Sequence, residues 1–186
     1  MASAFTHAVV GLALGTGFRT PGPPARFWAL GAVCAALPDL DVVAFRFGIP
    51  YGHMLGHRGL THSFAFAAAL AAAVATLAFR GREWDETRGF LWSYFFLATA
   101  SHGVLDMMTN GGRGVALFAP LENGRYFLPW RPIEVSPIGV TPFFTERGFE
   151  ILRSELQWVW APAIAFALAC LVAQRLRRPR LGASDA

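Results

Sequence analysis

The sequence has no lysine, few charged residues and only two cysteines. Charged residues make up 15% of the 186 residues, against about 25% in an ordinary soluble domain. Cys34 and Cys170 lie far apart inside apolar stretches and lack the Cys-x-x-Cys spacing of a zinc ribbon. These deficits exclude intrinsic disorder, a disulfide-rich scaffold and a zinc ribbon.

What the chain has instead is long apolar runs. Hydrophobic residues make up 54% of it, and its mean hydropathy is +0.41, which is typical of integral membrane proteins. Five segments are candidate spans: 5–18, 27–47, 63–79, 89–109 and 156–176. A span needs about 20 residues, so the first segment is short, and whether it spans or is re-entrant stays open. We predict an all-α bundle of about four to five transmembrane helices.

The domain organisation follows from these runs. We expect one integral membrane domain over residues 1–178 and a disordered tail over 179–186. The N-terminus has neither the basic region nor the cleavage site of a signal peptide. We therefore expect the first apolar segment to be retained in the protein. The connection over 110–155 is rich in aromatic residues and prolines, which favours an external loop at the membrane interface. It could act as a lid or serve only as an anchored connector.

The 16 basic residues are all arginines, and the net charge is +4. No stretch interleaves basic and aromatic residues as a nucleic-acid platform does, so no nucleic acid binding is expected and the arginines are assigned to topology and lipid head groups. Four arginines lie at the end of the last span and directly after it: Arg175, Arg177, Arg178 and Arg180. This basic cluster predicts a cytoplasmic C-terminus.

With that orientation, the unusual polar residues of four segments fall on the outer side of the membrane. They are His7, Asp39, Asp41, His57, His62, His102 and Asp106. Ionisable side chains at such a depth are costly unless they pair, bind a ligand or line a cavity. We therefore predict one shared site near the outer membrane face.

Two pairs within this set have informative spacings. His102 and Asp106 stand four residues apart, on one helix face, as a pair that grips a cation or simply hydrogen-bonds. Asp39 and Asp41 stand two apart and cannot share a helical face, but Pro38 can unwind the helix locally and turn both inward. One of them could orient a ligating histidine, and the alternative is a pair of solvated loop aspartates.

The run from Gly56 to Ser63 is the most informative stretch. It places His57, Arg58 and His62 among glycines and hydroxyls directly before an apolar helix, which Thr61 or Ser63 could cap. Arg58 and the helix N-terminus would form an anion-binding corner. A capping loop with incidental histidines is the alternative reading, and His53 is expected to be peripheral.

These motifs together resemble a known family. Over about residues 1 to 140, the chain resembles the YdjM-like family of bacterial inner-membrane, metal-dependent hydrolases. The motifs that carry the resemblance are Thr6-His7, Leu37-Pro38-Asp39-Leu40-Asp41, His57 through Ser63, and His102 through Asp106 with Thr109-Asn110-Gly111. The resemblance implies a metal site made by His7, Asp39, Asp41, His57, His62, His102 and Asp106. It also implies a likeness to zinc-dependent phospholipase C enzymes and related nucleases. No histidine follows His102, so one or two metal ions are expected rather than three.

The expected function is therefore a membrane-bound, metal-dependent hydrolase. Zinc is favoured, with manganese or iron as alternatives, and the metal would activate water against a phosphoester, possibly a lipid-derived one. Asp39 or Asp41 would act as general base, and Arg58 would stabilise charge on a phosphoryl oxygen. No Gly-x-Ser-x-Gly motif is present, which disfavours a serine hydrolase. The rival is a non-enzymatic protein that binds, senses or transports metal ions or protons. Membrane lipids are expected partners, and the oligomeric state is open.

Overall fold

The computed structural model describes residues 1–18, 24–138 and 141–177, and these form helices and connecting loops without a named strand. The α-helices are α1 (Ala4–Gly15), α2 (Ala25–Ala36), α3 (Phe64–Leu77), α4 (Arg88–Met107), α5 (Glu146–Glu155) and α6 (Ala161–Leu176). Short 3-10 helices are η1 (Leu37–Phe47), η2 (Leu60–His62), η3 (Arg82–Trp84) and η4 (Thr141–Phe144), and η5 (Leu156–Trp160) is a π-helix. The all-α prediction is confirmed, and the tail predicted over 179–186 lies outside the described residues.

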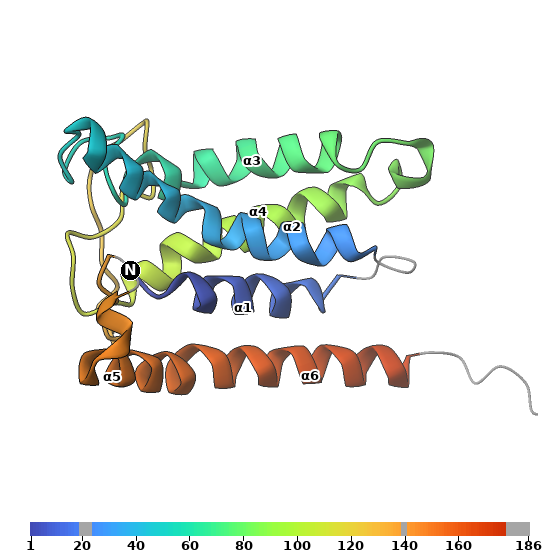
Figure 1. Ribbon diagram of the computed structural model, residues 1–186. Helices are drawn as coiled ribbons and strands as arrows, with labels where there is room; N and C mark the ends of the chain where they lie inside the picture. Colours follow the sequence, from blue (N-terminus) through green and yellow to red (C-terminus); the bar gives the residue numbers. More distant parts are fainter. Residues whose placement is uncertain (19–23, 139–140, 178–186) are drawn as a thin grey trace, which may run out of the picture.

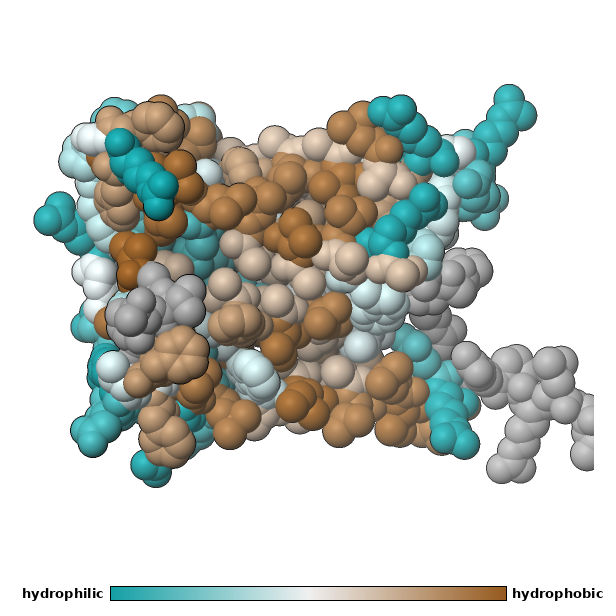
Figure 2. Space-filling view, viewed as in Figure 1, coloured by the Kyte–Doolittle hydropathy of each residue, from teal (hydrophilic) through white to brown (hydrophobic). Residues whose placement is uncertain are grey.

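Two continuous helical segments are long and apolar enough to cross a membrane. They are Ala25–Phe47, with 23 residues, and Glu146–Leu176, with 31. α1 has 12 residues, which at 1.5 Å per residue give about 18 Å, well below the roughly 30 Å of a bilayer core. Apolar side chains cover the middle of the molecule, and hydrophilic ones gather at both ends (Figure 2). This surface is that of a membrane protein, while the four to five spans remain a prediction.

The helices form a bundle with α4 packed against α1, α2 and α3 (Figure 1). Small residues allow close approach, as is common between membrane helices. A side chain on Gly31 would collide with the Tyr94 hydroxyl, which instead donates a hydrogen bond to the Gly11 carbonyl at 3.0 Å. Phe27 stacks on Tyr94 with 4.4 Å between ring centroids. These contacts hold α1, α2 and α4 closely together.

The second apolar segment changes its helix type where the sequence analysis expected local unwinding. α2 ends at Ala36, and the chain continues as the 3-10 helix η1, with Pro38 in its first turn. Pro38 has no amide hydrogen to continue the α-helical pattern. Asp39 and Asp41 lie on this irregular stretch, and the side chains of both are more than nine-tenths buried.

The C-terminal helix begins earlier than the sequence indicates. Residues 146–155, which were placed in the interfacial loop, form α5 and run through η5 directly into α6. At the end of α5, the fully buried carboxylate of Glu155 accepts hydrogen bonds from the Ser3 amide, from the Ser3 hydroxyl at 2.6 Å and from the Thr6 hydroxyl at 2.8 Å. Glu155 therefore ties the C-terminal helix to the first turn of α1.

We expect Glu155→Ala to lower the free energy of unfolding by roughly 3 kcal/mol, since each buried donor left without a partner costs about 1–3 kcal/mol. Thermal and denaturant unfolding in detergent micelles would measure the loss. Glu150→Gln is the matched control, because Glu150 lies on the same helix with its side chain exposed and pairs only with Arg147. Equal stability of the two variants would contradict the anchoring role.

Candidate metal centre

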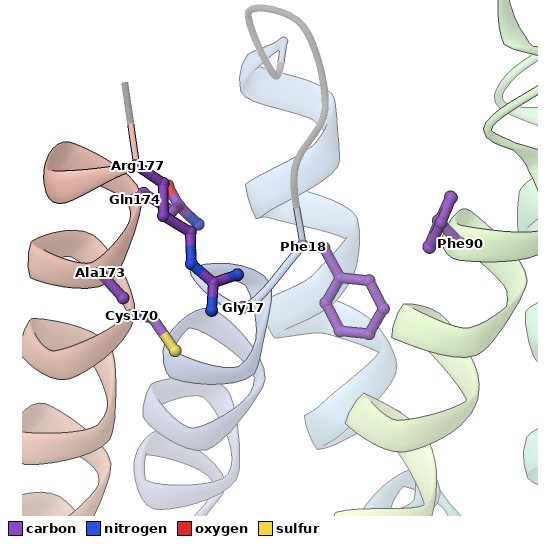
Figure 3. A pocket seen from close by; sticks show the side chains of 7 residues that line it. All are labelled: Gly17, Phe18, Phe90, Cys170, Ala173, Gln174 and Arg177. Carbon is purple, nitrogen blue, oxygen red and sulfur yellow. The ribbon is translucent and has the colours of Figure 1, made fainter. Parts of the chain in front are cut away.

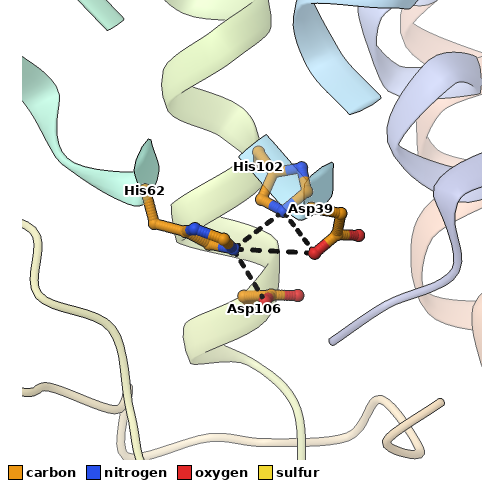
Figure 4. Close-up of side chains that lie close together, drawn as sticks. All are labelled: Asp39, His62, His102 and Asp106. Atoms are coloured by element: carbon orange, nitrogen blue, oxygen red, sulfur yellow. Dashed lines mark hydrogen bonds and ion pairs between the residues drawn. The ribbon is translucent and has the colours of Figure 1, made fainter. Parts of the chain in front are cut away.

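Four side chains from three parts of the chain converge at one end of the bundle (Figure 4). Asp39 comes from η1, His62 from η2, and His102 and Asp106 from one face of α4. All four residues are buried, and one ligand atom of each lies within 4.8 Å of the others. We call this group the tetrad. Residues separated by up to 67 positions in the sequence therefore share one site, as the polar pattern predicts.

The tetrad distances are short enough for one cation to contact all four groups. The two imidazole Nε2 atoms of His62 and His102 lie 3.1 Å apart. Asp39 Oδ1 lies 3.3 Å from His102 Nε2 and 3.7 Å from His62 Nε2, and Asp106 Oδ2 lies 3.6 Å from His62 Nε2. Two imidazole nitrogens and two carboxylate oxygens form a donor set that suits zinc.

Neighbouring groups fix the orientation of both imidazoles. The Ala35 carbonyl lies 2.7 Å from His102 Nδ1, and because a carbonyl only accepts, Nδ1 carries the proton. His62 Nδ1 lies 3.2 Å from Asp41 Oδ2, which is the carboxylate–histidine arrangement of many metal sites. The two Nε2 lone pairs therefore face each other, and a proton or a cation must lie between them.

The unpaired atoms of the cluster also fit a cation. Both carboxylate oxygens of Asp39 and both ring nitrogens of His7 are buried without a hydrogen-bond partner, whereas Asp106 Oδ2 meets Arg58 Nε at 2.9 Å. Buried polar atoms are rarely left in this state unless a ligand satisfies them. With neutral histidines, the three carboxylates of Asp39, Asp41 and Asp106 outnumber the neighbouring positive groups, Arg58 and the N-terminal amine, so the cluster carries a net negative charge that favours a cation.

In the absence of a cation, His62 is the group that would supply positive charge. Burial disfavours its imidazolium form, but the nearby carboxylates of Asp106, Asp39 and Asp41 outweigh burial and raise the pKa of His62 to about 10. The tetrad is thus a site that demands a positive charge at the meeting point of the two imidazoles.

Asp41 and His57 form a second group that shares His62 with the tetrad. Asp41 Oδ1 lies 2.7 Å from His57 Nδ1, while Oδ2 accepts the Thr61 hydroxyl at 2.7 Å and the Arg58 amide at 3.1 Å. The Asp41 oxygens therefore already have protein donors. This arrangement suits a carboxylate that orients His57 and His62.

His7 lies directly beside the tetrad. Its ring stacks on His102 with 3.6 Å between centroids, and its Nε2 lies 3.6 Å from Asp106 Oδ1. The residue is fully buried. All seven residues expected to bind metal therefore lie in one cluster, while the His53 ring is exposed and accepts the Leu55 amide.

Arg58 is fully buried and pairs with Asp106, Nε to Oδ2, at 2.9 Å. Its terminal nitrogens donate to the Thr109 hydroxyl and to the Gly111 carbonyl, each at 3.0 Å. The backbone of Arg58 has φ 60, a conformation that non-glycine residues adopt mainly at functional or otherwise constrained sites. The guanidinium expected to face a substrate thus makes protein contacts that hold Asp106 in place.

The loop that carries these residues is held by glycines and by an arginine that the sequence analysis missed. A side chain on Gly59 would lie 2.1 Å from the Met54 carbonyl, and one on Gly103 would lie 2.7 Å from the His62 carbonyl. Arg125 donates to the backbone carbonyls of Tyr51, His53, His57 and Arg58. No local motif marks Arg125, because its partners lie about 70 positions away.

Helix α3 begins directly after this loop, at the Ser63 cap, whose side chain accepts the Phe66 amide at 3.1 Å.

A hollow of about 220 Å³ opens beside the cluster. His57 lines it together with Tyr51, Gly112 and Ser136. Gly112 also covers the guanidinium of Arg58, since a side chain there would lie 2.6 Å from Arg58 Nη1. The hollow thus gives a small molecule a place to contact His57.

The fold and the cluster define the class: an all-helical membrane protein with a buried histidine and aspartate site that could bind a metal ion. The chain belongs to the family of YdjM inner membrane proteins, which matches residues 1–180. It is 38% identical over 166 residues to the inner membrane protein YbcI of Escherichia coli (strain K12), and the match covers 88% of this chain and 94% of YbcI. No solved structure matches the chain significantly. The family resemblance carried by the polar motifs is confirmed.

Proposed function

We propose that the protein is a membrane-bound, metal-dependent hydrolase that acts on a phosphoester, with lipid-derived phosphoesters as the favoured class. The observation that carries this proposal is the pair of Nε2 atoms of His62 and His102, held 3.1 Å apart between two buried carboxylates. His62, His102, Asp39 and Asp106 would hold the metal, zinc in the first place, with manganese and iron compatible with the same ligand types. A bound divalent ion would supply Lewis acidity and activate water near neutral pH.

Asp39 is the best candidate for the general base. Both of its oxygens lack a hydrogen-bond partner, and its side chain is the most exposed of the tetrad, at 8%. One oxygen can face the metal while the other takes a proton from the attacking water. Asp41, whose oxygens are occupied, would position His57 and His62 instead.

His57 is suited to proton transfer at the leaving group. Its Nδ1 is held by Asp41 at 2.7 Å, and its ring lines the hollow beside the cluster. A carboxylate that orients an imidazole in this way is a common general acid or base unit. Arg58 would contribute its charge from beneath Gly112 while it fixes Asp106.

The phosphoester assignment rests on charge and location. The proposed cation at the tetrad and the guanidinium of Arg58 would both favour an anionic reacting group beside His57, which lines the hollow. The apolar middle and hydrophilic ends of the face in Figure 2 support a position of this end of the bundle near a membrane surface. A lipid-derived substrate would reach the hollow without leaving the membrane.

The test is a turnover screen on the detergent-purified protein loaded with zinc, manganese or iron, with phosphomonoesters, phosphodiesters and phospholipids as substrates. We expect metal-dependent release of product, and we expect His57→Gln to retain the metal while turnover falls by roughly 10²–10⁴-fold, the range that general acid–base catalysis contributes. His53→Gln, on the same loop but outside the cluster, is the matched control and should keep full turnover. Metal uptake into proteoliposomes without any turnover would support the transport alternative and reject the hydrolase.

A further inference from the structure

A second hollow, of about 490 Å³, lies at the end of the bundle opposite the metal centre (Figures 1 and 3). The lining comes from three parts of the chain: Gly17 and Phe18 follow α1, Phe90 belongs to α4, and Cys170 lies in α6 with Arg177 directly after it. Two further residues of α6 complete the lining. Its volume is in the range of pockets that hold small ligands. None of these residues has a role in the metal centre.

The hollow arises because neighbouring helices differ in length. α1 ends at Gly15, while α6 continues to Leu176 and packs chiefly against α1. Gln174 Nε2 donates to the Thr16 carbonyl at 2.6 Å and fixes the end of α1 on α6. A side chain on Gly17 would lie 3.6 Å from the Phe166 ring and 3.9 Å from Cys170 Sγ. The space beside this junction is therefore a built feature of the fold.

The walls and the rim of the hollow differ in chemistry. Phe18, Phe90 and Cys170 make the walls apolar, whereas Arg177 extends its guanidinium toward Gly17 at the rim (Figure 3). Within residues 1–18, 24–138 and 141–177, Arg177 pairs with no carboxylate, in contrast to Arg88, which lies 2.8 Å from Asp85. An apolar slot with an unpaired guanidinium at the end of a long apolar helix matches a molecule with an acyl chain and a phosphate.

We propose that this hollow binds an anionic phospholipid, with its phosphate on Arg177 and one acyl chain between Phe18, Phe90 and Cys170. Arginine binds phosphate through two parallel hydrogen bonds, and basic pockets between membrane helices are known to select anionic head groups. The lipid would fill the gap between α6 and the rest of the bundle.

Native mass spectrometry of the full-length, detergent-purified protein tests this site. Phosphatidylglycerol and phosphatidylcholine with identical acyl chains are the probes, and Arg177→Gln is compared with Arg175→Gln, an exposed arginine of the same helix turn that does not line the hollow. We expect phosphatidylglycerol retention to fall about tenfold in Arg177→Gln, as for loss of one charge-assisted contact, and to stay unchanged in Arg175→Gln. Equal retention of the two lipids, or unchanged retention in Arg177→Gln, would overturn the proposal.

The two cysteines provide a second, independent readout on the unmodified chain. Cys170 lines the hollow and is partly exposed, whereas Cys34 is buried in the core. Phosphatidylglycerol should slow maleimide labelling of Cys170, and phosphatidylcholine should slow it less. Identical protection by both lipids would indicate general micelle shielding and would reject a selective site. Because the metal centre lies at the other end of the bundle, this outcome is separate from the outcome of the hydrolase test.

Discussion

His102→Ala is expected to abolish stoichiometric metal binding by the purified protein. His102 Nε2 lies at the centre of the tetrad, 3.1 Å from His62 Nε2 and 3.3 Å from Asp39 Oδ1, and no other nitrogen can replace it on the same face of α4. Loss of outer-sphere partners typically costs 10–100-fold in metal affinity, so loss of a direct ligand should cost roughly a hundredfold or more. Elemental analysis after dialysis against zinc or manganese measures the effect.

Asp39→Ala should give the same result from a different element, since Asp39 belongs to η1 rather than to α4. His53→Ala is the control, because it removes an exposed histidine that makes no contact with the tetrad. Circular dichroism would verify that each variant keeps its helices. Full metal content in His102→Ala and Asp39→Ala would show that the metal, if any, binds elsewhere.

The second large effect is expected for Arg58→Gln, which should lower the free energy of unfolding by about 3–5 kcal/mol. That is the typical result of removing one partner of a buried ion pair. Arg58 and Asp106 both have side chains that are 0% exposed. The substitution also removes the donors to Thr109 and Gly111. Chemical unfolding in mixed micelles, followed by tryptophan fluorescence, measures the loss.

Arg88→Gln is the matched control for this prediction. Arg88 also pairs with an aspartate, at 2.8 Å, but the two side chains are 39% and 60% exposed, and exposed pairs contribute about 0–1 kcal/mol. The double variant Arg58→Gln with Asp106→Asn should recover part of the stability, because it removes the carboxylate charge of the pair. If Arg58→Gln costs no more than Arg88→Gln, the buried pair has no structural importance.

The polar pattern was sufficient to predict which residues meet. Ionisable residues in apolar segments have few alternatives to a shared site, and this constraint identified His7, Asp39, His62, His102 and Asp106 without any structural information. The irregular helix after Pro38 was predictable for the same local reason, because proline removes a backbone donor.

The contacts that orient these residues were not predictable from local patterns. Arg125 binds carbonyls about 70 positions away, and Glu155 reaches across the bundle to Ser3 and Thr6. Both looked like ordinary charges of an interfacial segment. The sequence also placed residues 146–155 in a loop, because their charged face conceals a helix that continues directly into α6.

The first turn of α1 has a further consequence. The Ala2 amide donates to Asp106 Oδ1 at 2.8 Å, and one turn later Thr6 donates to Glu155 Oε2 at 2.8 Å. The segment from Ala2 to Thr6, which precedes α1 and enters its first turn, thus connects a tetrad carboxylate with the anchor of the C-terminal helix. We expect a ligand that binds more tightly when Asp106 is held in this position to favour the docked C-terminal helix, and docking of the helix to favour that ligand by the same factor. On this expectation, ligand binding at the tetrad and docking of the C-terminal helix are linked through residues 2–6.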